Sequence, residues 1–231
     1  MKKIANKSLV VVMALSLLFY SCDAVKNANN TQKGGAIGAT GGAVIGGVIG
    51  NNVGDGDNTA LGAIIGGVVG GAAGAYIGNR MDKQAKEIEQ EIPGAEVTRV
   101  GEGISVTFDE NSGVYFATNK ANINAKSQET LDKLVGIFKE YPNTNVLVEG
   151  HTDNTGADSY NMTLSKERAQ SVTSYLTGHG LASGRFTTKW YGETQPKYDN
   201  STAEGRAKNR RVELAIVANE EMKEEAAQQT N

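Results

Sequence analysis

The sequence predicts an α+β domain preceded by a pair of glycine-rich helices. In the C-terminal half, apolar residues alternate with polar ones, as at Ile104, Val106 and Phe108, which is the pattern of a half-buried strand. Stretches with apolar residues at helical spacing separate such strands. Upstream, glycine recurs at every fourth position between Gly34 and Gly78, a spacing typical of closely packed helices.

The domain is expected over residues 97–218, with its elements in the order β-α-β-α-β-β. The expected strands are residues 103–108, 146–150, 187–191 and 211–217, and the expected helices are residues 125–141 and 164–176. Residues 113–116 fit either a second short strand or a bend, and residues 202–207 fit a short helix. This order predicts helices packed on one side of a single sheet.

Residues 34–80 predict a glycine-zipper helical hairpin. Two runs with glycine at every fourth position, residues 34–50 and 62–78, flank a polar turn. Glycine in a helix costs about 1 kcal/mol relative to alanine, so ten regularly spaced glycines need the compensation of close helix contact. Three alternatives stay open for the hairpin: insertion in lipid, self-association into a homo-oligomer, and packing against a partner in water. A disordered linker fits the strict period and the aliphatic content less well.

Residues 1–21 have the features of a bacterial lipoprotein signal peptide. Lys2, Lys3 and Lys7 precede an apolar run of about twelve residues, which is too short to span a bilayer as a stable helix. The run ends just before Cys22, the only cysteine. Cleavage before Cys22 and acylation of its sulfur and amine would anchor the chain in membrane lipid. The alternative is an ordinary signal peptide in which the cysteine is incidental.

The expected location is the outer membrane, with the C-terminal domain in the periplasm. Asp23 resembles the inner-membrane retention signal of some enteric bacteria, so the inner membrane remains an alternative. The remaining segments predict linkers: residues 22–33 a polar flexible tether, residues 81–96 a charged helical connector exposed to solvent, and residues 219–231 a flexible tail.

A candidate site lies in the stretch 145–176. Leu164, Arg168 and Val172 share one face of the expected helix, so Arg168 lies in an apolar stripe. A guanidinium is costly there unless a partner compensates its charge. The nearest candidate is Asp153, which follows the preceding strand. The two groups could hold a zwitterionic ligand, or they could bind only each other.

Alternation along the last strand adds a second arginine to this question. Arg210 lies on the side of Val212 and Leu214, whereas Arg211 points to the other side. The Arg210 side chain could open into the mouth of a pocket or extend past the edge of the sheet. The spacing alone favours neither.

Composition and motifs argue against other classes of function. The nearly balanced charge, −3 at pH 7, lacks the clustered basic surface of a nucleic-acid-binding protein. One cysteine and two distant histidines, His151 and His179, argue against a metal site, and no cofactor motif is found. His151 beside Asp153 suggests acid–base catalysis, but no nucleophile or oxyanion donor accompanies it. We therefore expect no catalytic residues, no cofactor and no metal.

Three motifs resemble those of the OmpA C-terminal-like (OmpA/MotB) family, in the same order. They are Glu149-Gly150-His151-Thr152-Asp153, Asn161-x-x-Leu164-Ser165-x-x-Arg168-Ala169-x-x-Val172-x-x-x-Leu176, and Asn209-Arg210-Arg211-Val212. The resemblance implies the same α+β fold. It also implies non-covalent binding of peptidoglycan through the zwitterionic end of diaminopimelate, since a guanidinium grips a carboxylate and a carboxylate accepts an ammonium.

By motif position, the resemblance implies ligand contacts from Asp153 and Arg168, with a further carboxylate contact from Arg210. Thr118 and Asn119 match the loop that lines the pocket. Many family members have an aspartate where Ala117 stands, so a contact from that side chain is missing here. The expected function is that of a non-enzymatic lipoprotein that tethers the membrane to the cell wall. The alternative is a membrane assembly factor or pore that acts through the glycine hairpin.

Overall fold

The computed structural model describes residues 71–109, 112–117 and 119–229. The predicted signal peptide, the tether with Cys22, and residues 34–70 of the hairpin lie outside the described residues, as does Thr118. Those predictions therefore stay predictions.

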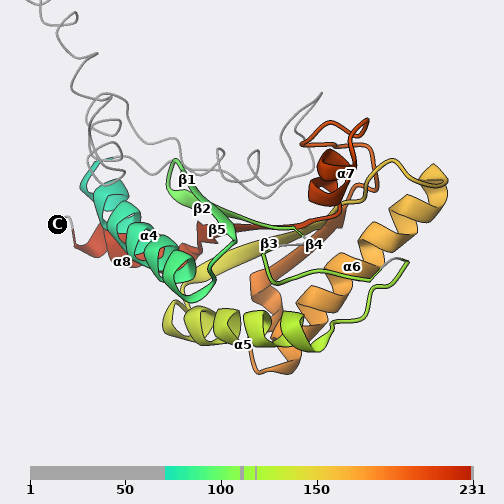
Figure 1. Ribbon diagram of the computed structural model, residues 1–231. Helices are drawn as coiled ribbons and strands as arrows, with labels where there is room; N and C mark the ends of the chain where they lie inside the picture. Colours follow the sequence, from blue (N-terminus) through green and yellow to red (C-terminus); the bar gives the residue numbers. More distant parts are fainter. Residues whose placement is uncertain (1–70, 110–111, 118, 230–231) are drawn as a thin grey trace, which may run out of the picture.

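A five-stranded mixed sheet forms the centre of the domain (Figure 1). The strands are β1 (Glu96–Val100), β2 (Gly103–Phe108), β3 (Thr144–Gly150), β4 (Phe186–Trp190) and β5 (Val212–Ala218). Their spatial order is β1-β2-β5-β3-β4, with β3 and β4 parallel and the other neighbouring pairs antiparallel. The last strand in the chain thus lies in the middle of the sheet, where it joins the β2 and β3 segments.

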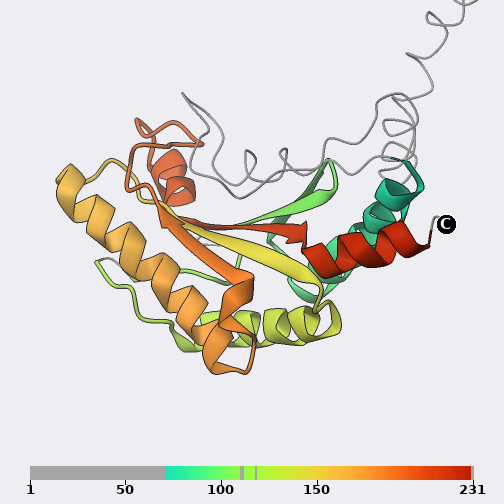
Figure 2. The same cartoon turned by 180° about the vertical axis from the view of Figure 1, so that it is seen from behind.

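Helices α5 (Ala125–Glu140) and α6 (Asp158–Gly178) cover one side of this sheet (Figures 1 and 2). A 3₁₀ turn, η2 (Ser183–Arg185), leads into β4, and the short helix α7 (Ala203–Asn209) precedes β5. The predicted order β-α-β-α-β-β is confirmed as β2-α5-β3-α6-β4-β5. Residues 113–116 form no strand, so of the two predicted alternatives the bend is confirmed.

Helix α6 begins six residues before the predicted start at Leu164. Its first turn carries Asp158, whose negative charge is favourable at a helix N-terminus. Apolar periodicity cannot detect this polar turn, because the turn extends beyond the body of the domain. Strand β1 was also missed. It is a half-exposed edge strand whose short alternation gives a weak signal.

Two helices predicted as a solvated connector and a flexible tail belong to the folded domain. Helix α4 (Gly71–Glu91) and helix α8 (Glu220–Gln228) lie side by side at one end of the sheet (Figures 1 and 2). Ile77 and Met81 of α4 and Met222 of α8 are almost completely buried in the common core. The helix predicted for the connector is confirmed as far as Glu91. Its predicted exposure to solvent and the flexible tail were wrong, because these few apolar residues at helical spacing suffice to bury one face of each helix.

Polar contacts also fix the two helices. The Tyr76 hydroxyl donates to Glu225 at 3.2 Å, and the Asn143 side chain donates to the other oxygen of the same carboxylate at 2.8 Å. Within the described residues, the last two glycines of the repeat, Gly74 and Gly78, lie on the buried face of α4. No helix in the described part of the chain is both long and apolar enough to cross a membrane.

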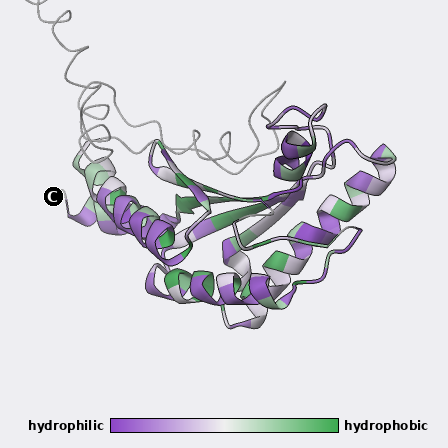
Figure 3. Cartoon of the chain, viewed as in Figure 1, coloured by the Kyte–Doolittle hydropathy of each residue, from purple (hydrophilic) through white to green (hydrophobic). Residues whose placement is uncertain are grey.

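The two faces of the sheet differ in chemistry. On the side of α5 and α6, alternate residues of β2, β3 and β5 form the apolar core. Figure 3 shows hydrophobic segments in the strands and in the helices α4 and α5. On the other side, Leu147 and Ala215 form a small apolar cluster. The same side also carries two buried glutamates, Glu149 and Glu213. The alternation predicted for β5 is confirmed, because Val212, Leu214 and Ile216 all lie on the side of the main core.

Candidate functional site

The end of β3 and the middle of α6 are almost in contact, and glycine makes this possible. A Cβ atom on Gly150 would lie 2.2 Å from the backbone oxygen of Ser165, so any larger residue would push the helix away. The Ser165 hydroxyl accepts a hydrogen bond from the backbone N–H of Gly192 at 2.9 Å. Gly192 has a φ of +56°, which favours glycine. These contacts bring the loop after β3, helix α6 and the loop after β4 to one place.

Asp153 lies in the loop after β3 and is held by two neighbours. One carboxylate oxygen accepts from the backbone N–H of Thr155 at 2.8 Å, and the other accepts from Nη1 of Arg210 at 2.5 Å. Burial by itself raises the pKa of Asp153, but the hydrogen bonds from Arg210 and Thr155 outweigh it and leave the pKa below its ordinary value. Asp153 is therefore an anion at neutral pH.

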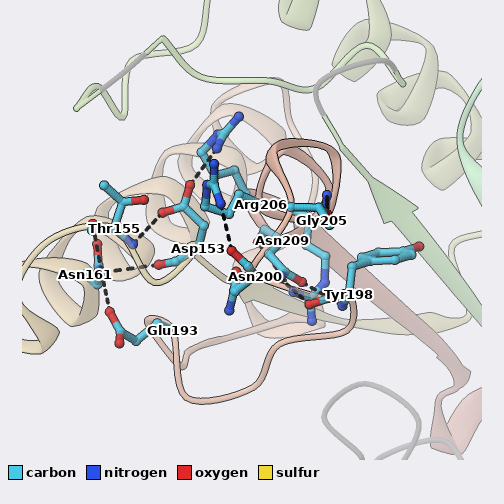
Figure 4. Close-up of polar contacts among 12 residues, drawn as sticks. Asp153, Thr155, Asn161, Glu193, Tyr198, Asn200, Gly205, Arg206 and Asn209 are labelled. Carbon is cyan, nitrogen blue, oxygen red and sulfur yellow. Dashed lines mark hydrogen bonds and ion pairs between the residues drawn. The ribbon is translucent and has the colours of Figure 1, made fainter.

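Asn161, in the first turns of α6, holds the loop after β3 and the loop after β4 together. Its side-chain amide donates to the backbone oxygens of Asp153 (3.3 Å) and Thr155 (3.2 Å) and to the carboxylate of Glu193 at 2.5 Å. Figure 4 shows Asn161 between the Asp153 loop and Glu193. The sequence motif contained Asn161, but no role was assigned to it. Glu193 lies in a polar loop without a recognisable pattern, so the sequence offered no signal for it.

The first three residues of the third motif, Asn209, Arg210 and Arg211, each make different contacts. Asn209 is buried and holds the preceding loop: its side chain accepts from the backbone N–H of Tyr198 (3.0 Å) and donates to the side chain of Asn200 (2.8 Å), as Figure 4 shows. Arg210 turns to Asp153. Arg211 turns to the opposite side and donates to Glu213 at 2.5 Å. The predicted divergence of the two arginines is confirmed, and Arg210 lies against the loop after β3.

Arg168 is 3% exposed, and its described contacts are with the loop before α5. Its Nε donates to the backbone oxygen of Lys120 at 3.1 Å, and its guanidinium carbon lies 5.2 Å from the centre of the Phe116 ring. In the same loop, Asn119 is exposed and has a φ of +56°, a left-handed conformation that asparagine adopts more readily than most residues.

The structure thus brings the predicted site residues together in two groups. Asp153 bonds to Arg210, although the sequence pointed to Arg168 as its partner. Arg168 joins the loop that carries Asn119. Both groups contact the same face of α6, on which Asn161 and Arg168 lie seven residues, or about 10 Å, apart. Direct pairing of Asp153 with Arg210 could not be inferred from spacing, because 57 residues separate them.

A second polar cluster lies on the other face of the sheet. Glu149 and Glu213 are directly opposite each other on β3 and β5, and His151 follows on the same side. Burial, together with the charges of Arg211 and Lys197, lowers the pKa of His151 well below its ordinary value. Donor atoms of the three side chains could hold a metal ion. One histidine and two glutamates from different strands form no motif along the chain, so this cluster left no signal in the sequence.

Two parts of the chain match the models of known protein families. Residues 115–210 match the model of the OmpA family. This region belongs to the OmpA family. Residues 1–82 match the model of the YMGG-like Gly-zipper. The matches cover the candidate site and the glycine repeat, respectively, and support the resemblance found in the motifs.

Individual relatives match part of the chain. The protein named "Probable lipoprotein YiaD" from Escherichia coli is 39% identical over 142 residues, which are 61% of this chain and 64% of that protein. Outer membrane porin F from Pseudomonas aeruginosa is 41% identical over 125 residues, 54% of this chain and 33% of the porin. The chain therefore spans less than two thirds of either relative.

A solved structure has the same fold. It is the cell wall anchor of the T6SS from Pseudomonas aeruginosa, which is 31% identical with a TM-score of 0.51 and covers 60% of this chain and 97% of that one. The α+β arrangement of the described residues is thus that of OmpA-like domains.

Proposed function

We propose that this protein binds peptidoglycan non-covalently through its OmpA-like domain and tethers a membrane to the cell wall. The observation that carries the proposal is the Asp153–Arg210 pair at the meeting point of the three motifs. The match of residues 115–210 to the OmpA family supports it, as does the likeness to a cell wall anchor.

The chemistry of the pair suits the zwitterionic end of diaminopimelate. An ammonium on the ligand would bind the carboxylate of Asp153, whose pKa is lowered so that it stays charged. The α-carboxylate of the ligand would bind a guanidinium, for which Arg210 and Arg168 are the candidates. Arg210 is the more accessible of the two, since 30% of its side chain is exposed.

The loop before α5 would complete the site. Asn119, together with Thr118, would contact the ligand from the side of Arg168. The left-handed backbone of Asn119 and the hydrogen bond from Arg168 to Lys120 hold this loop in place. Ala117 is exposed and lacks a polar side chain, so the ligand receives no carboxylate contact from that position.

The test is sedimentation with purified cell-wall sacculi. The double variant Asp153→Ala/Arg168→Ala and the single variant Arg210→Ala should remain in the supernatant, whereas the unaltered protein should sediment. Lys208→Ala is the matched control: it removes a positive charge from α7, two residues from Arg210, where the side chain pairs only with its exposed neighbour Glu204 among the ion pairs described. If the double variant sediments as well as the unaltered protein, the proposed site is wrong.

We further propose that Cys22 carries acyl chains that anchor the protein in the outer membrane, with the OmpA-like domain in the periplasm. A relative is named as a lipoprotein, and other relatives are outer membrane proteins. The variant Cys22→Ser should lose incorporation of labelled palmitate and move from the membrane to the soluble fraction. Retention of both properties would contradict the anchor.

The glycine hairpin supports a second role, in membrane assembly or pore formation. The match of residues 1–82 to a Gly-zipper model favours close helix packing in this segment. Detergent-resistant homo-oligomers that disappear on Gly66→Leu would support this role. Oligomers unaffected by that substitution would argue against it.

A further inference from the structure

The face of the sheet away from α5 and α6 contains two buried glutamates that oppose each other. Glu149 of β3 and Glu213 of β5 are register partners in the antiparallel pair, and they are 0% and 4% exposed. Like charges directly across two strands repel each other, and burial strengthens the repulsion. His151 lies beside them and is 0% exposed. Such an arrangement needs compensating positive charge, and at Glu213 the guanidinium of Arg211 supplies part of it.

The three side chains converge. One oxygen of each carboxylate and one ring nitrogen of His151 lie within 4.8 Å of one another. Hydrogen bonds from outside the cluster orient the carboxylates: the Tyr191 hydroxyl donates to Glu149 at 3.1 Å, and Nε of Arg211 donates to Glu213 at 2.5 Å. Contacts of this kind orient the carboxylates that bind metals in proteins.

The imidazole of His151 is the second and independent observation. Both of its ring nitrogens are buried, and neither has a hydrogen-bond partner. The ring itself is fixed, because it stacks on Tyr191 with 5.4 Å between the ring centres and 19° between the planes. Buried polar atoms normally have partners, so a nitrogen that faces two carboxylate oxygens without one indicates a ligand between them.

We propose that Glu149, His151 and Glu213 bind a divalent transition-metal ion. One imidazole nitrogen and two carboxylate oxygens form a mixed donor set that suits Zn²⁺, whereas Ca²⁺ and Mg²⁺ prefer oxygen ligands throughout. Donor atoms around Zn²⁺ lie about 2.0–2.2 Å from the metal, so the side chains need to converge by about 1 Å. The charge of Arg211 beside Glu213 weakens the attraction, so we expect an affinity below that of structural zinc sites.

The first test uses the unaltered full-length protein in detergent, stripped of metal with a chelator. Titration with Zn²⁺ in a calorimeter should give one equivalent bound. Because the ion binds only the folded cluster, the melting temperature should rise by about 2–5 °C at saturating Zn²⁺. No heat of binding and no thermal shift up to about 100-fold the protein concentration would overturn the proposal, whatever the variants do.

The second test locates the ion. His151→Gln should lower the affinity for Zn²⁺ at least tenfold and should remove the visible absorption of bound Co²⁺. His179→Gln is the matched control, since His179 is the second histidine and its partly exposed side chain bonds to the backbone of Tyr175. Loss of binding in His179→Gln with retention in His151→Gln would overturn the assignment. Sacculus binding is measured separately, so failure of the metal site leaves the proposed function untouched.

Discussion

Two consecutive arginines, Arg210 and Arg211, form ion pairs of the same length in different surroundings. Each guanidinium lies 2.5 Å from a carboxylate oxygen, Arg210 from Asp153 and Arg211 from Glu213. The side chains of the first pair are 30% and 9% exposed, and those of the second are 3% and 5% exposed. They directly precede β5 and point to opposite sides, so the alternation of the strand extends to these two residues.

The two pairs differ in the exposure of their side chains and not in the distance between their charged atoms. This difference in exposure separates a role in binding from a role in stability. When one partner of a buried pair is removed, the other charge stays in a medium that cannot solvate it. In the Asp153–Arg210 pair water reaches the guanidinium and partly screens the interaction, so its net stabilisation is smaller and a ligand can approach from the Arg210 side. We therefore assign the Asp153–Arg210 pair to binding and the Arg211–Glu213 pair to stability.

The largest expected effect is on the buried pair. Arg211→Ala should lower the free energy of unfolding by about 3–5 kcal/mol, because it leaves the Glu213 carboxylate buried without this guanidinium. Urea denaturation would measure the loss. The double variant Arg211→Met/Glu213→Leu should recover most of the stability, since apolar side chains tolerate burial. A loss below about 1 kcal/mol in the single variant would remove the distinction between the two pairs.

A smaller effect is expected at Gly150, where β3 meets the helix that contributes to the binding side. Gly150→Ala should destabilise the domain by about 1–3 kcal/mol, because the new methyl group would overlap the Ser165 backbone and displace α6. Gly136→Ala is the matched control on α5. A Cβ there meets nothing within 4 Å, so this variant should be neutral or up to about 1 kcal/mol more stable. Equal effects of the two substitutions would contradict the close approach.

Arg210→Ala should lower the free energy of unfolding by about 1 kcal/mol, because water reaches the pair on the Arg210 side and the buried Asp153 carboxylate keeps the hydrogen bond from Thr155. The same variant should lose sacculus binding, which separates binding from folding. Urea denaturation and sedimentation on one preparation would test both statements. Arg210→Lys keeps the charge but lacks the planar fork, so partial binding is expected. A large loss of stability would show that this pair is architectural as well.

The smallest effect concerns acid stability. The folded-state pKa of Asp153 is depressed, so its contribution to stability is present above its unfolded pKa of about 3.9 and is lost as the pH falls through the folded value. Arg210→Ala removes a cause of the depression, so its acid unfolding midpoint should lie at a higher pH than that of the unaltered protein. Lys208→Ala should show a smaller shift, because the pKa that Lys208 depresses is that of Glu204, a carboxylate fully exposed to solvent. Far-ultraviolet circular dichroism between pH 2 and pH 6 would compare the three proteins.

Much of the domain could be predicted because its patterns are local. Val212, Leu214 and Ile216 fall on one side of β5 through simple alternation, and Pro93 and Pro142 mark the ends of two helices. Short or half-exposed elements gave weak signals, so β1 was missed and α8 was taken for a tail. Two buried residues four positions apart, Met222 and Ala226, were enough to dock α8, and so short an apolar pattern among charged residues gives a weak signal.

The sequence by itself determined the element order of the domain, its family resemblance and the divergence of Arg210 from Arg211. These properties depend on residue type and on spacing along the chain. Only the tertiary structure decided that Asp153 bonds to Arg210, and that Glu149 and Glu213 lie opposite each other beside His151. Pairings across the sheet depend on strand order and register, and distant parts of the chain establish these together when the core packs.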